Sequence, residues 1–485
     1  MKINTLKVEN FKCFKTYDIS FAPNTTIIIG RNGAGKSTIL SAIKKSLSFI
    51  FANNKSLGKD FLSAGNSSLN IKSFSDGDYR YDSETRTYST DVDIKSTGTF
   101  AGEPLEWELY KRSTANASLY SGKYKDAFIK FTHKWKNEKV DLPVLVYFSD
   151  KYPTIETKQT KYAMDSILKD SIARNFGYYQ WDISCTSIWE TRMCNQLAHS
   201  MSLKTKIERI KNSLSSLEKN HNEADLKSND RYNELKYSLE QNNKLLTPLE
   251  EEINYIQDKL INFSCELPNL YDEEYYIEYL VPETTSLGFE LKIVFKNGKS
   301  SLLNGLPAGY HRLYSMVFDI AYRAFILNGS KEPSGIVVID EVDLHLHPSL
   351  EQEVVRCLNK FFPNIQFIMT THSVAVISNL NTVKKADDKV TPLNSILFMQ
   401  DGQSKAEILS GTFGLDMNAT LRDFMDTPSS NIETKQMGDE YLKYCSIGLK
   451  KEAESTLKKI INIVGSEDHD LIKELKEKSK AYEIH

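Results

Sequence analysis

The pattern of apolar and polar residues predicts an alternation of buried strands and amphipathic helices. Apolar residues alternate with polar ones through residues 1–22, which predicts two strands that meet around residues 10–16. The β-branched run from Ile27 to Ile29 predicts a buried parallel strand, and a helix-compatible run follows from Thr38 to about Leu47. Further strand-length apolar runs lie at residues 142–148, 288–295, 336–339, 365–370 and 395–399.

Polar and small residues become frequent between residues 52 and 150. Short apolar runs at 68–72 and 105–110 predict short, half-exposed antiparallel strands joined by turn-rich links. The two kinds of strand together predict an α/β fold with a mixed sheet and an antiparallel β lobe.

Residues 200–262 carry apolar side chains at alternating steps of three and four, which predicts two antiparallel helices. A coiled-coil hairpin over about residues 202–262 would form an arm of roughly 30 Å, with about 20 residues in each helix. A plain helical subdomain folded onto the body explains the pattern equally well. Residues 221–230 are polar and predict the turn, and Pro248 predicts a kink or an interruption in the second helix.

The sequence from residue 427 onward is highly charged, with apolar residues at helical spacing, and it predicts a small three-helix appendage. The predicted organisation is a head made from residues 1–155 and 285–426, a helical insertion at 156–284 and a C-terminal helical region at 427–485.

Composition narrows the class of protein. The 485 residues are 40% hydrophobic and 26% charged, which is ordinary for a soluble protein. A net charge of −3 argues against a protein covered by nucleic acid, but it is compatible with a local basic groove. The six cysteines are scattered without metal-ligand spacing, and neither a membrane span nor a secretory signal is predicted. We therefore expect a cytoplasmic protein with reduced thiols.

The strand at residues 27–29 leads into a phosphate-binding loop. Glycines let backbone N–H groups converge on phosphate oxygens, Lys36 supplies a positive charge, and the Ser37 hydroxyl is a ligand for Mg²⁺. A chance glycine-rich turn is the weaker interpretation, because the full pattern stands between a strand and a helix. The loop that we expect to bind a nucleoside triphosphate is Gly30, Arg31, Asn32, Gly33, Ala34, Gly35, Lys36, Ser37 and Thr38.

A second buried strand ends in Asp340 and Glu341. Such a pair alone is mostly a cap or a pair of loop charges, but a matching phosphate loop lies upstream. We expect Asp340 to bind Mg²⁺ and Glu341 to polarise the attacking water. His372 follows a third strand, where an imidazole can contact a γ-phosphate. The pair His345 and His347 lacks a third metal ligand and is interpreted as a turn that contacts a second subunit.

These motifs resemble the ABC-type ATPase heads of the RecF/SMC/OLD group, in which a helical arm separates the phosphate loop from the acid pair. The resemblance implies a signature loop at Leu306, Ala308 and Gly309 that contacts the ATP of the opposite subunit, so we expect at least a dimer. Pro307 stands where the group usually has serine, which removes a hydroxyl and a backbone N–H donor from the contact that closes the dimer. Val342-Asp343 replaces the usual Pro-Glu after the acid pair, so hydrolysis is expected to be slow. The glutamine that senses Mg²⁺ in the group is not located. The residues that carry the resemblance are Phe11-Lys12-Cys13-Phe14, the loop at 30–38, Ile339-Asp340-Glu341, Leu344-His345-Leu346-His347-Pro348 and Thr370-Thr371-His372-Ser373.

Within this group, the overall length, the strand at 142–148, residues 305–312 and the ending from Leu421-Arg422-Asp423 into short charged helices carry a further resemblance. In these features the chain is similar to the PtuA ATPases of Septu anti-phage systems, including the retron-linked forms. This resemblance implies an ATPase that assembles with itself and with an HNH nuclease subunit of the PtuB type, docked partly through the C-terminal helices. A reverse transcriptase with its RNA–DNA product joins the retron-linked complexes.

Proteins of the same group suggest two alternative functions for this chain. A DNA-repair ATPase that acts on DNA ends stays open, because one chain does not reveal its partners. A nuclease of the OLD type is disfavoured, because the roughly 85 residues after Met399 contain no strand followed by a glutamate and then Asp-x-Asp.

Overall fold

The computed structural model describes residues 1–52, 69–113, 117–138, 140–153, 161–184, 186–220, 226, 229–267, 274–285, 288–386, 389–415, 420, 432–467 and 469–480. The chain forms two compact units, Met1–Gly414 and Leu415–His485. Most of the predicted turn at 221–230 and the start of the predicted C-terminal region, 427–431, lie outside the described residues.

A six-stranded sheet forms the centre of the first unit. Its strand order is β17-β16-β3-β13-β12-β8; every neighbouring pair is parallel except β16 and β17, which are antiparallel. The mixed sheet predicted from the sequence is therefore confirmed. Its strands are β3 (Thr25–Gly30), β8 (Val144–Phe148), β12 (Ser334–Ile339), β13 (Asn364–Thr370), β16 (Asn394–Met399) and β17 (Glu407–Leu409).

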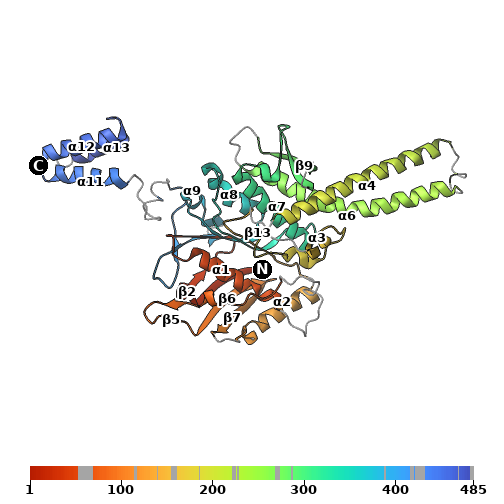
Figure 1. Ribbon diagram of the computed structural model, residues 1–485, viewed down its shortest axis with the longest axis horizontal. Coiled ribbons are helices and arrows are strands. Elements are labelled where there is room, and N and C mark those ends of the chain that lie inside the picture. The colour runs from red at the N-terminus through yellow and green to blue at the C-terminus, as the bar shows by residue number, and fades with distance from the viewer. Residues whose placement is uncertain are drawn as a thin grey trace. The chain divides into compact units, whose positions relative to one another are not determined.

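The sequences of the central strands are continuous apolar runs because helices cover both faces of the sheet. Figure 1 shows α1 (Lys36–Leu47) on one side of the sheet and α7 (Ala308–Asn328) with α8 (Pro348–Phe361) on the other. The shorter α9 (Val374–Asn379) packs beside α8.

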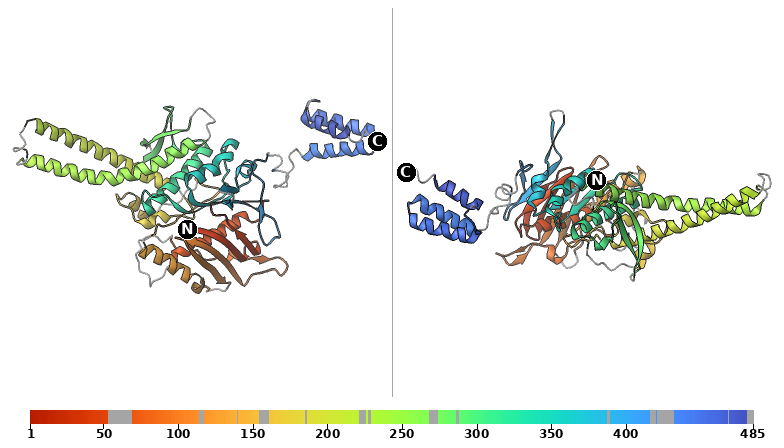
Figure 2. Two further views of the ribbon diagram at one scale, coloured as in Figure 1. Left: turned by 180° about the vertical axis from the view of Figure 1, so that it is seen from behind. Right: turned by 90° about the horizontal axis from the view of Figure 1, so that it is seen from above.

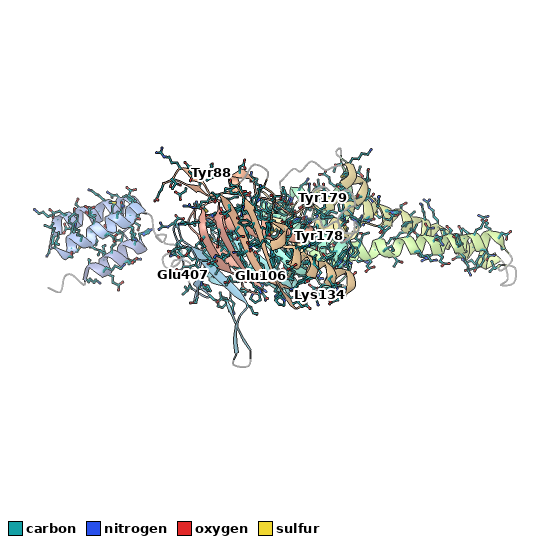
Figure 3. The ribbon with its side chains drawn as sticks, turned by 90° about the horizontal axis from the view of Figure 1, so that it is seen from below. Tyr88, Glu106, Lys134, Tyr178, Tyr179 and Glu407 are labelled. Carbon is teal, nitrogen blue, oxygen red and sulfur yellow. The ribbon has the colours of Figure 1, made fainter. Side chains whose placement is uncertain are left out.

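A four-stranded antiparallel sheet lies against the other side of α1, with the order β2-β1-β6-β7. Its inner face contributes Leu6 and Trp107 to the core that α1 shares, and its outer face is polar. Figure 3 shows this sheet from outside, with Glu106 labelled over its strands and Lys134 on the helix α2 (Lys125–Asn137) beside it. The strands are β1 (Lys2–Phe11), β2 (Phe14–Ser20), β6 (Asp91–Phe100) and β7 (Glu103–Arg112).

Two predictions for this lobe are wrong. β6 and β7 are ten residues each rather than short, and residues 69–72 of the strand predicted at 68–72 are irregular. The helix α2 (Lys125–Asn137) was not predicted, although Ala127, Phe128 and Phe131 recur at helical spacing and are buried. The helix was missed because the sequence is rich in lysine and its apolar stripe has only these three residues, which the structure shows to be covered by the core.

The buried side chain of Gln366 joins the two sheets. Its Oε1 accepts the backbone N–H of Ile3 at 2.8 Å, and its Nε2 donates to the carbonyls of Ile3 and Ala22 at 2.8 Å each. Gln366 lies in β13 and Ile3 in β1, so one amide fixes the antiparallel sheet to the middle of the parallel one. A buried amide with its groups paired defines one docking position for the sheets.

Two long helices, α4 (Ser187–Asn220) and α6 (Asp230–Glu266), pack against each other and extend from the body as an arm. Figure 2 shows the arm from behind and from above. The helices have 34 and 37 residues, longer than predicted, because both continue past the arm into the body. Pro248 does not interrupt α6, so the predicted interruption is absent: the exposed proline gives up one helical bond while Leu249 and Ile253 stay buried. The alternative, a kink at Pro248, stays a prediction. Coiled-coil packing within the arm stays a prediction.

The base of the arm is held by buried polar and aromatic contacts. Arg192 of α4 pairs with Glu252 of α6 through two bonds of 2.6 Å, and the two side chains are 1% and 5% exposed. The Trp189 ring of α4 stacks on Tyr322 of α7 with centroids 5.4 Å apart, and its Nε1 donates to Asp319 at 3.2 Å. α4, α6 and α7 therefore meet at one buried cluster.

The remaining strands form small sheets: β9 (Ile277–Thr285), β10 (Gly288–Phe295) and β11 (Ser300–Leu302) in one, β4 (Tyr81–Asp82) with β5 (Thr87–Tyr88), and β14 (Val383–Ala386) with β15 (Lys389–Pro392). The short helix α3 (Lys161–Ile167) precedes the arm. In the second unit, α11 (Ile432–Ser446), α12 (Lys450–Val464) and α13 (Asp470–Ser479) enclose a small core around Tyr441, Ile460 and Ile472, as the predicted helical appendage requires. Across the described parts of both units, no helix is long and apolar enough to cross a membrane.

Asp93 is a buried carboxylic acid on the outer face of the antiparallel sheet. Its Oδ2 lies 3.4 Å from the Lys95 amine. Burial, reinforced by the neighbouring Glu108 carboxylate, nevertheless raises the pKa of Asp93 to about 7. The folded protein therefore holds a proton that the unfolded chain releases near pH 4.

We expect the free energy of unfolding to fall as pH rises between about 4 and 7, by no more than about 1.4 kcal/mol per pH unit from this group. The sign follows because the native state binds the extra proton. Urea unfolding across this range measures it, and Asp93→Asn should flatten the dependence. Asp18→Asn, on the exposed part of the same face, is the matched control; an equal flattening by both variants would contradict the assignment to Asp93.

Candidate functional site

Three parallel strands bring the predicted site residues to one edge of the sheet. β13 lies between β3 and β12, with Thr370 opposite Ile28 and Met369 opposite Ile339. The carboxyl ends of parallel strands meet at the same edge, so the phosphate loop after β3 and the acid pair after β12 end two strand spacings apart, about 10 Å. The two segments, which are far apart in the sequence, lie at the same edge of the sheet with the end of β13 between them.

Backbone geometry explains the glycines at both ends of the loop. Gly30 has φ 152°, and a Cβ there would lie 2.4 Å from the carbonyl oxygen of Met399. Gly35 has φ 92°, and a Cβ there would lie 2.3 Å from the Phe14 ring. A side chain at either position would strain the backbone and push a neighbour aside. The loop can therefore follow this path only with glycine at these points.

Lys36 lies across the loop. Its amine donates to the carbonyls of Gly30 at 2.8 Å and Arg31 at 3.2 Å. Burial lowers the pKa of Lys36, and the carboxylates of Asp340 and Glu341 oppose that shift. The amine is thus within electrostatic reach of both acids, and it is held by carbonyls that an anionic oxygen can replace.

The loop and the helix after it fit an anionic group and a magnesium ion. α1 begins at Lys36 after Gly35, with no side-chain cap and no acidic residue in its first turn, so its N–H groups and positive end face the loop uncompensated. Among the described residues, no three acidic, histidine or cysteine side chains converge on one metal position. Magnesium commonly takes one or two protein ligands together with phosphate and water oxygens. Ser37 and Asp340 fit that ligand set.

Thr370, at the end of β13, orders the acid pair. Its hydroxyl donates to Asp340 Oδ1 at 2.6 Å and accepts the backbone N–H of Glu341 at 2.8 Å. On the other side, the Tyr147 hydroxyl donates to Asp340 Oδ2 at 3.5 Å. Asp340 is 8% exposed, and Glu341 is half-buried with φ 53°, a left-handed conformation that costs about 1–2 kcal/mol outside glycine. The local backbone is therefore constrained by its contacts.

His372 is exposed between two anchored neighbours. Thr371 donates to Asp343 Oδ1 at 2.6 Å, and the Ser373 hydroxyl donates to Glu351 Oε2 at 2.5 Å. The Ser373 backbone N–H also donates to the Thr371 hydroxyl at 2.9 Å. The turn is thus fixed on both sides, with the imidazole at the edge where the strands end. Asp343, which departs from the pattern of the group, is one of the anchors.

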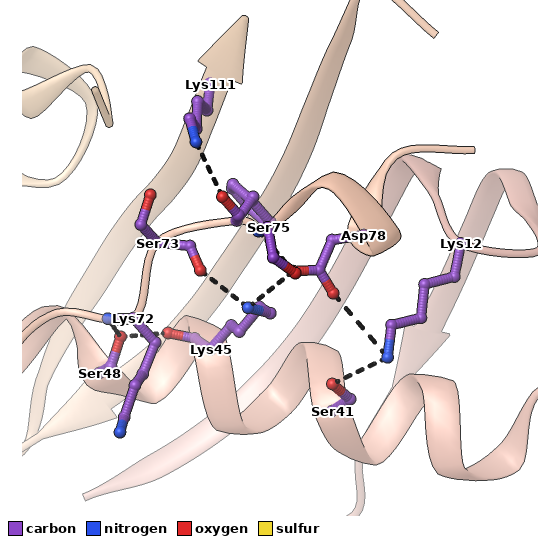
Figure 4. Close-up of polar contacts among 10 residues, drawn as sticks. Lys12, Ser41, Lys45, Ser48, Lys72, Ser73, Ser75, Asp78 and Lys111 are labelled. Carbon is purple, nitrogen blue, oxygen red and sulfur yellow. Dashed lines mark hydrogen bonds and ion pairs between the residues drawn. The ribbon is translucent and has the colours of Figure 1, made fainter. Parts of the chain in front are cut away.

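A cavity of about 420 Å³ adjoins the phosphate loop at Gly33 and Ala34. Its other walls are Cys13 with the first residues of β2 (residues 14–16), Arg80 and the turn between β16 and β17 (residues 400–404). Phe14 lies in this wall and also packs on Tyr17, with ring centroids 4.6 Å apart. Lys12 instead lies 3.5 Å from the Ser41 hydroxyl and 3.8 Å from Asp78 (Figure 4). The cavity has room for a nucleoside beside the loop.

The predicted signature residues surround the start of α7. Leu306 is buried, Ala308 is exposed, and a Cβ on Gly309 would lie 2.7 Å from the His345 carbonyl. Gly309 packs against the turn that follows the acid pair. Thr370 was expected only as part of the strand-end motif and Arg312 was not expected at the site, yet both side chains contact the acid-pair segment. Thr370 could have been identified from the sequence as a site residue, because it directly precedes the residues predicted at the strand end.

Three comparisons bear on this geometry. The sequence model of the family described as "AAA ATPase domain" matches residues 1–377. The chain is 26% identical over 418 residues to "Retron Vc95 probable ATPase" of Vibrio cholerae serotype O1 biovar El Tor, covering 79% of this chain and 72% of that protein. It is 25% identical over 185 residues to "Septu protein PtuA" of Bacillus thuringiensis, covering 36% and 46%. Among solved structures, a Smc head domain bound to the C-terminal domain of ScpA from Pyrococcus furiosus aligns with 84% of this chain and 97% of that one, at 16% identity and a TM-score of 0.40.

We expect Lys36→Ala to weaken ATP binding at least about tenfold, because the variant loses the charged donor at the phosphate loop. Equilibrium binding of a fluorescent ATP analogue measures this. Lys45→Ala is the matched control: Lys45 lies on the same helix, but its amine donates to Ser73 O at 2.8 Å and pairs with Asp78 at 3.0 Å (Figure 4). Unchanged binding by Lys36→Ala would refute the assignment of the loop.

Proposed function

The chain belongs to the AAA ATPase domain family and is an ATPase, and we propose that residues 30–38 bind the triphosphate of ATP while Glu341 directs the attacking water. The observation that carries this proposal is the convergence of Lys36, Asp340 and Glu341 at one edge of one sheet.

Each residue has a distinct part in the proposed reaction. The Lys36 amine exchanges its two loop carbonyls for phosphate oxygens, and the open N-terminus of α1 adds backbone donors. Ser37 and Asp340 hold Mg²⁺, which neutralises phosphate charge when bound. Glu341 accepts the proton of the attacking water, and His372, exposed after the end of β13, contacts the γ-phosphate. The base occupies the cavity lined by Phe14.

Two copies of the chain complete the site in this proposal. Leu306, Ala308 and Gly309 of one copy contact the ATP held by the other. The start of α7 has no side-chain cap, which leaves its first backbone N–H groups for such a contact. Pro307 supplies neither a hydroxyl nor an N–H, so dimer closure rests on fewer donors than a serine would allow.

The proposed biological role is the ATPase subunit of an anti-phage defence complex. Similarity to a retron ATPase over most of the chain supports it, and similarity to PtuA over a shorter stretch agrees. In this role the nucleotide state regulates an HNH nuclease carried by a separate subunit. In a retron-linked complex, a reverse transcriptase with its RNA–DNA product joins the assembly.

The second compact unit is the proposed docking site for the nuclease. It has its own core, yet Ile447, Leu449 and Ile463 expose 58%, 42% and 52% of their surface. Exposed aliphatic side chains on a unit this small suit a protein partner. This assigns residues 427–485 to partner docking.

We expect Glu341→Gln to slow ATP hydrolysis by about a hundredfold or more while ATP remains bound, since an amide cannot accept the proton. Single-turnover hydrolysis and nucleotide retained through gel filtration measure the two effects. Glu353→Gln, which removes an acid paired with Arg356 on α8, is the matched control. Hydrolysis by Glu341→Gln at the wild-type rate would exclude Glu341 as the base.

We expect a triple change of Ile447, Leu449 and Ile463 to serine to reduce nuclease recovery at least about tenfold in a pull-down from the native host, with ATP binding intact. Ile408→Ser, which alters a 64% exposed residue of the first unit, is the control. Nuclease recovery at the wild-type level, both with the triple variant and after deletion of residues 427–485, would refute the docking site. Absence of any HNH nuclease from the intact protein's pull-down would favour the DNA-repair function.

A further inference from the structure

Arg312 is a fully buried arginine in the second turn of α7. Its Nη2 donates to the backbone carbonyls of Asp340 at 2.8 Å and Glu341 at 3.1 Å. Its Nη1 donates to the carbonyls of Ser149 at 3.3 Å and of Tyr152. One guanidinium therefore joins the segments that follow β12 and β8.

These segments follow neighbouring strands. Ile339 of β12 lies opposite Phe148 of β8, and the Asp340 N–H donates to the Phe148 carbonyl at 2.8 Å. Arg312 extends this pairing beyond the end of the strands, where the chains would otherwise diverge. The planar fork of an arginine can reach carbonyls on two segments at once, which the single ammonium of lysine cannot reproduce.

Three hydrogen bonds fix the backbone on both sides of Glu341. The Glu341 N–H donates to the Thr370 hydroxyl, and Arg312 Nη2 donates to the carbonyls of Asp340 and Glu341. Glu341 has φ 53°, which a glutamate adopts only when its surroundings impose it. The side chain of Glu341 leaves the backbone from a position that Arg312 and Thr370 together determine.

The surroundings of Arg312 suit positioning better than stabilisation. Within the described part of the chain, no carboxylate forms an ion pair with it, and its Nε is buried without a hydrogen-bond partner. A buried charge of this kind is unfavourable for the folded state. Gly309, three residues earlier on the same helix, packs on the His345 carbonyl of the segment after the acid pair.

We propose that Arg312 is a positioning residue that holds the backbone of Glu341 in the conformation required for ATP hydrolysis. The inference rests on the proposed function, in which Glu341 directs the attacking water. Arg312 also links that conformation to α7, so a displacement of the start of this helix moves the Glu341 carbonyl directly.

The test separates turnover from nucleotide binding. Arg312→Lys keeps the charge and loses the fork, and we expect its kcat to fall about a hundredfold, the effect of a misplaced catalytic group. The Kd for ATP should stay within about threefold of the wild type, because Arg312 does not touch the phosphate loop. Hydrogen exchange of peptides covering residues 340–342 should accelerate. Arg312→Gln, which is uncharged, serves as a second variant if the lysine protein does not fold.

Arg323→Lys is the matched control. Arg323 is buried in the same helix, bonds Asp319, and donates to the carbonyls of Gly177 at 3.0 Å and Tyr179 at 2.9 Å. Its replacement should lower the Tm as Arg312→Lys does while leaving kcat per folded molecule unchanged.

Two results overturn the inference. If Glu341→Gln is inactive but both Arg312 variants retain kcat within about threefold, Arg312 does not position the acid and the proposed function survives. If Arg312→Lys and Arg323→Lys lower kcat equally, the effect is general destabilisation. Wild-type hydrolysis by Glu341→Gln would reject the proposed role of Glu341 and this inference with it.

Discussion

The register of three parallel strands is the constraint on which the site depends. β3, β13 and β12 come from separate parts of the chain, and each ends in the residues that the chemistry needs. A slip of one residue would turn every side chain to the opposite face of the sheet and separate Thr370 from Asp340. Burial of the sheet on both faces stabilises this register, and so does Gln366, whose side-chain amide hydrogen-bonds β13 to β1. The antiparallel sheet thus helps to align the strand that carries Thr370.

Buried arginines recur where separate segments must meet. Arg192 joins the two helices of the arm, Arg323 joins α7 to the segment around residues 177–179, and Arg312 joins the ends of two strands. Each donates mainly to backbone carbonyls or to one buried acid. Buried charges add little net stability, but removing one donor leaves several oxygens unpaired. The buried arginines therefore define the relative positions of these segments, and a purely apolar contact would define those positions less strictly.

The sequence predicted what local patterns encode. The phosphate loop, the acid pair and the buried strands each lie within about ten residues, so strand and loop signals were sufficient. The contacts of Gln366, Thr370 and Arg312 could not be predicted, because each depends on a partner far away in the chain. The full length of the two helices of the arm was missed for a related reason. Alternating steps of three and four mark only the part where α4 and α6 pack on each other, whereas near the body the helices also bury other faces.

The contact between the arm and α7 has a mechanical consequence. Along α6, the segment from Glu252 to Asp230 spans about 33 Å at 1.5 Å per residue. With the base clamped by Arg192 and Glu252 and by the stacked rings of Trp189 and Tyr322, a tilt of about 5° there sweeps the far end through about 3 Å. A motion near the sheet can therefore be too small to break a packing contact there and still displace the far end of the arm by several ångströms. A displacement of that size is enough to change the contacts of another molecule bound at that end.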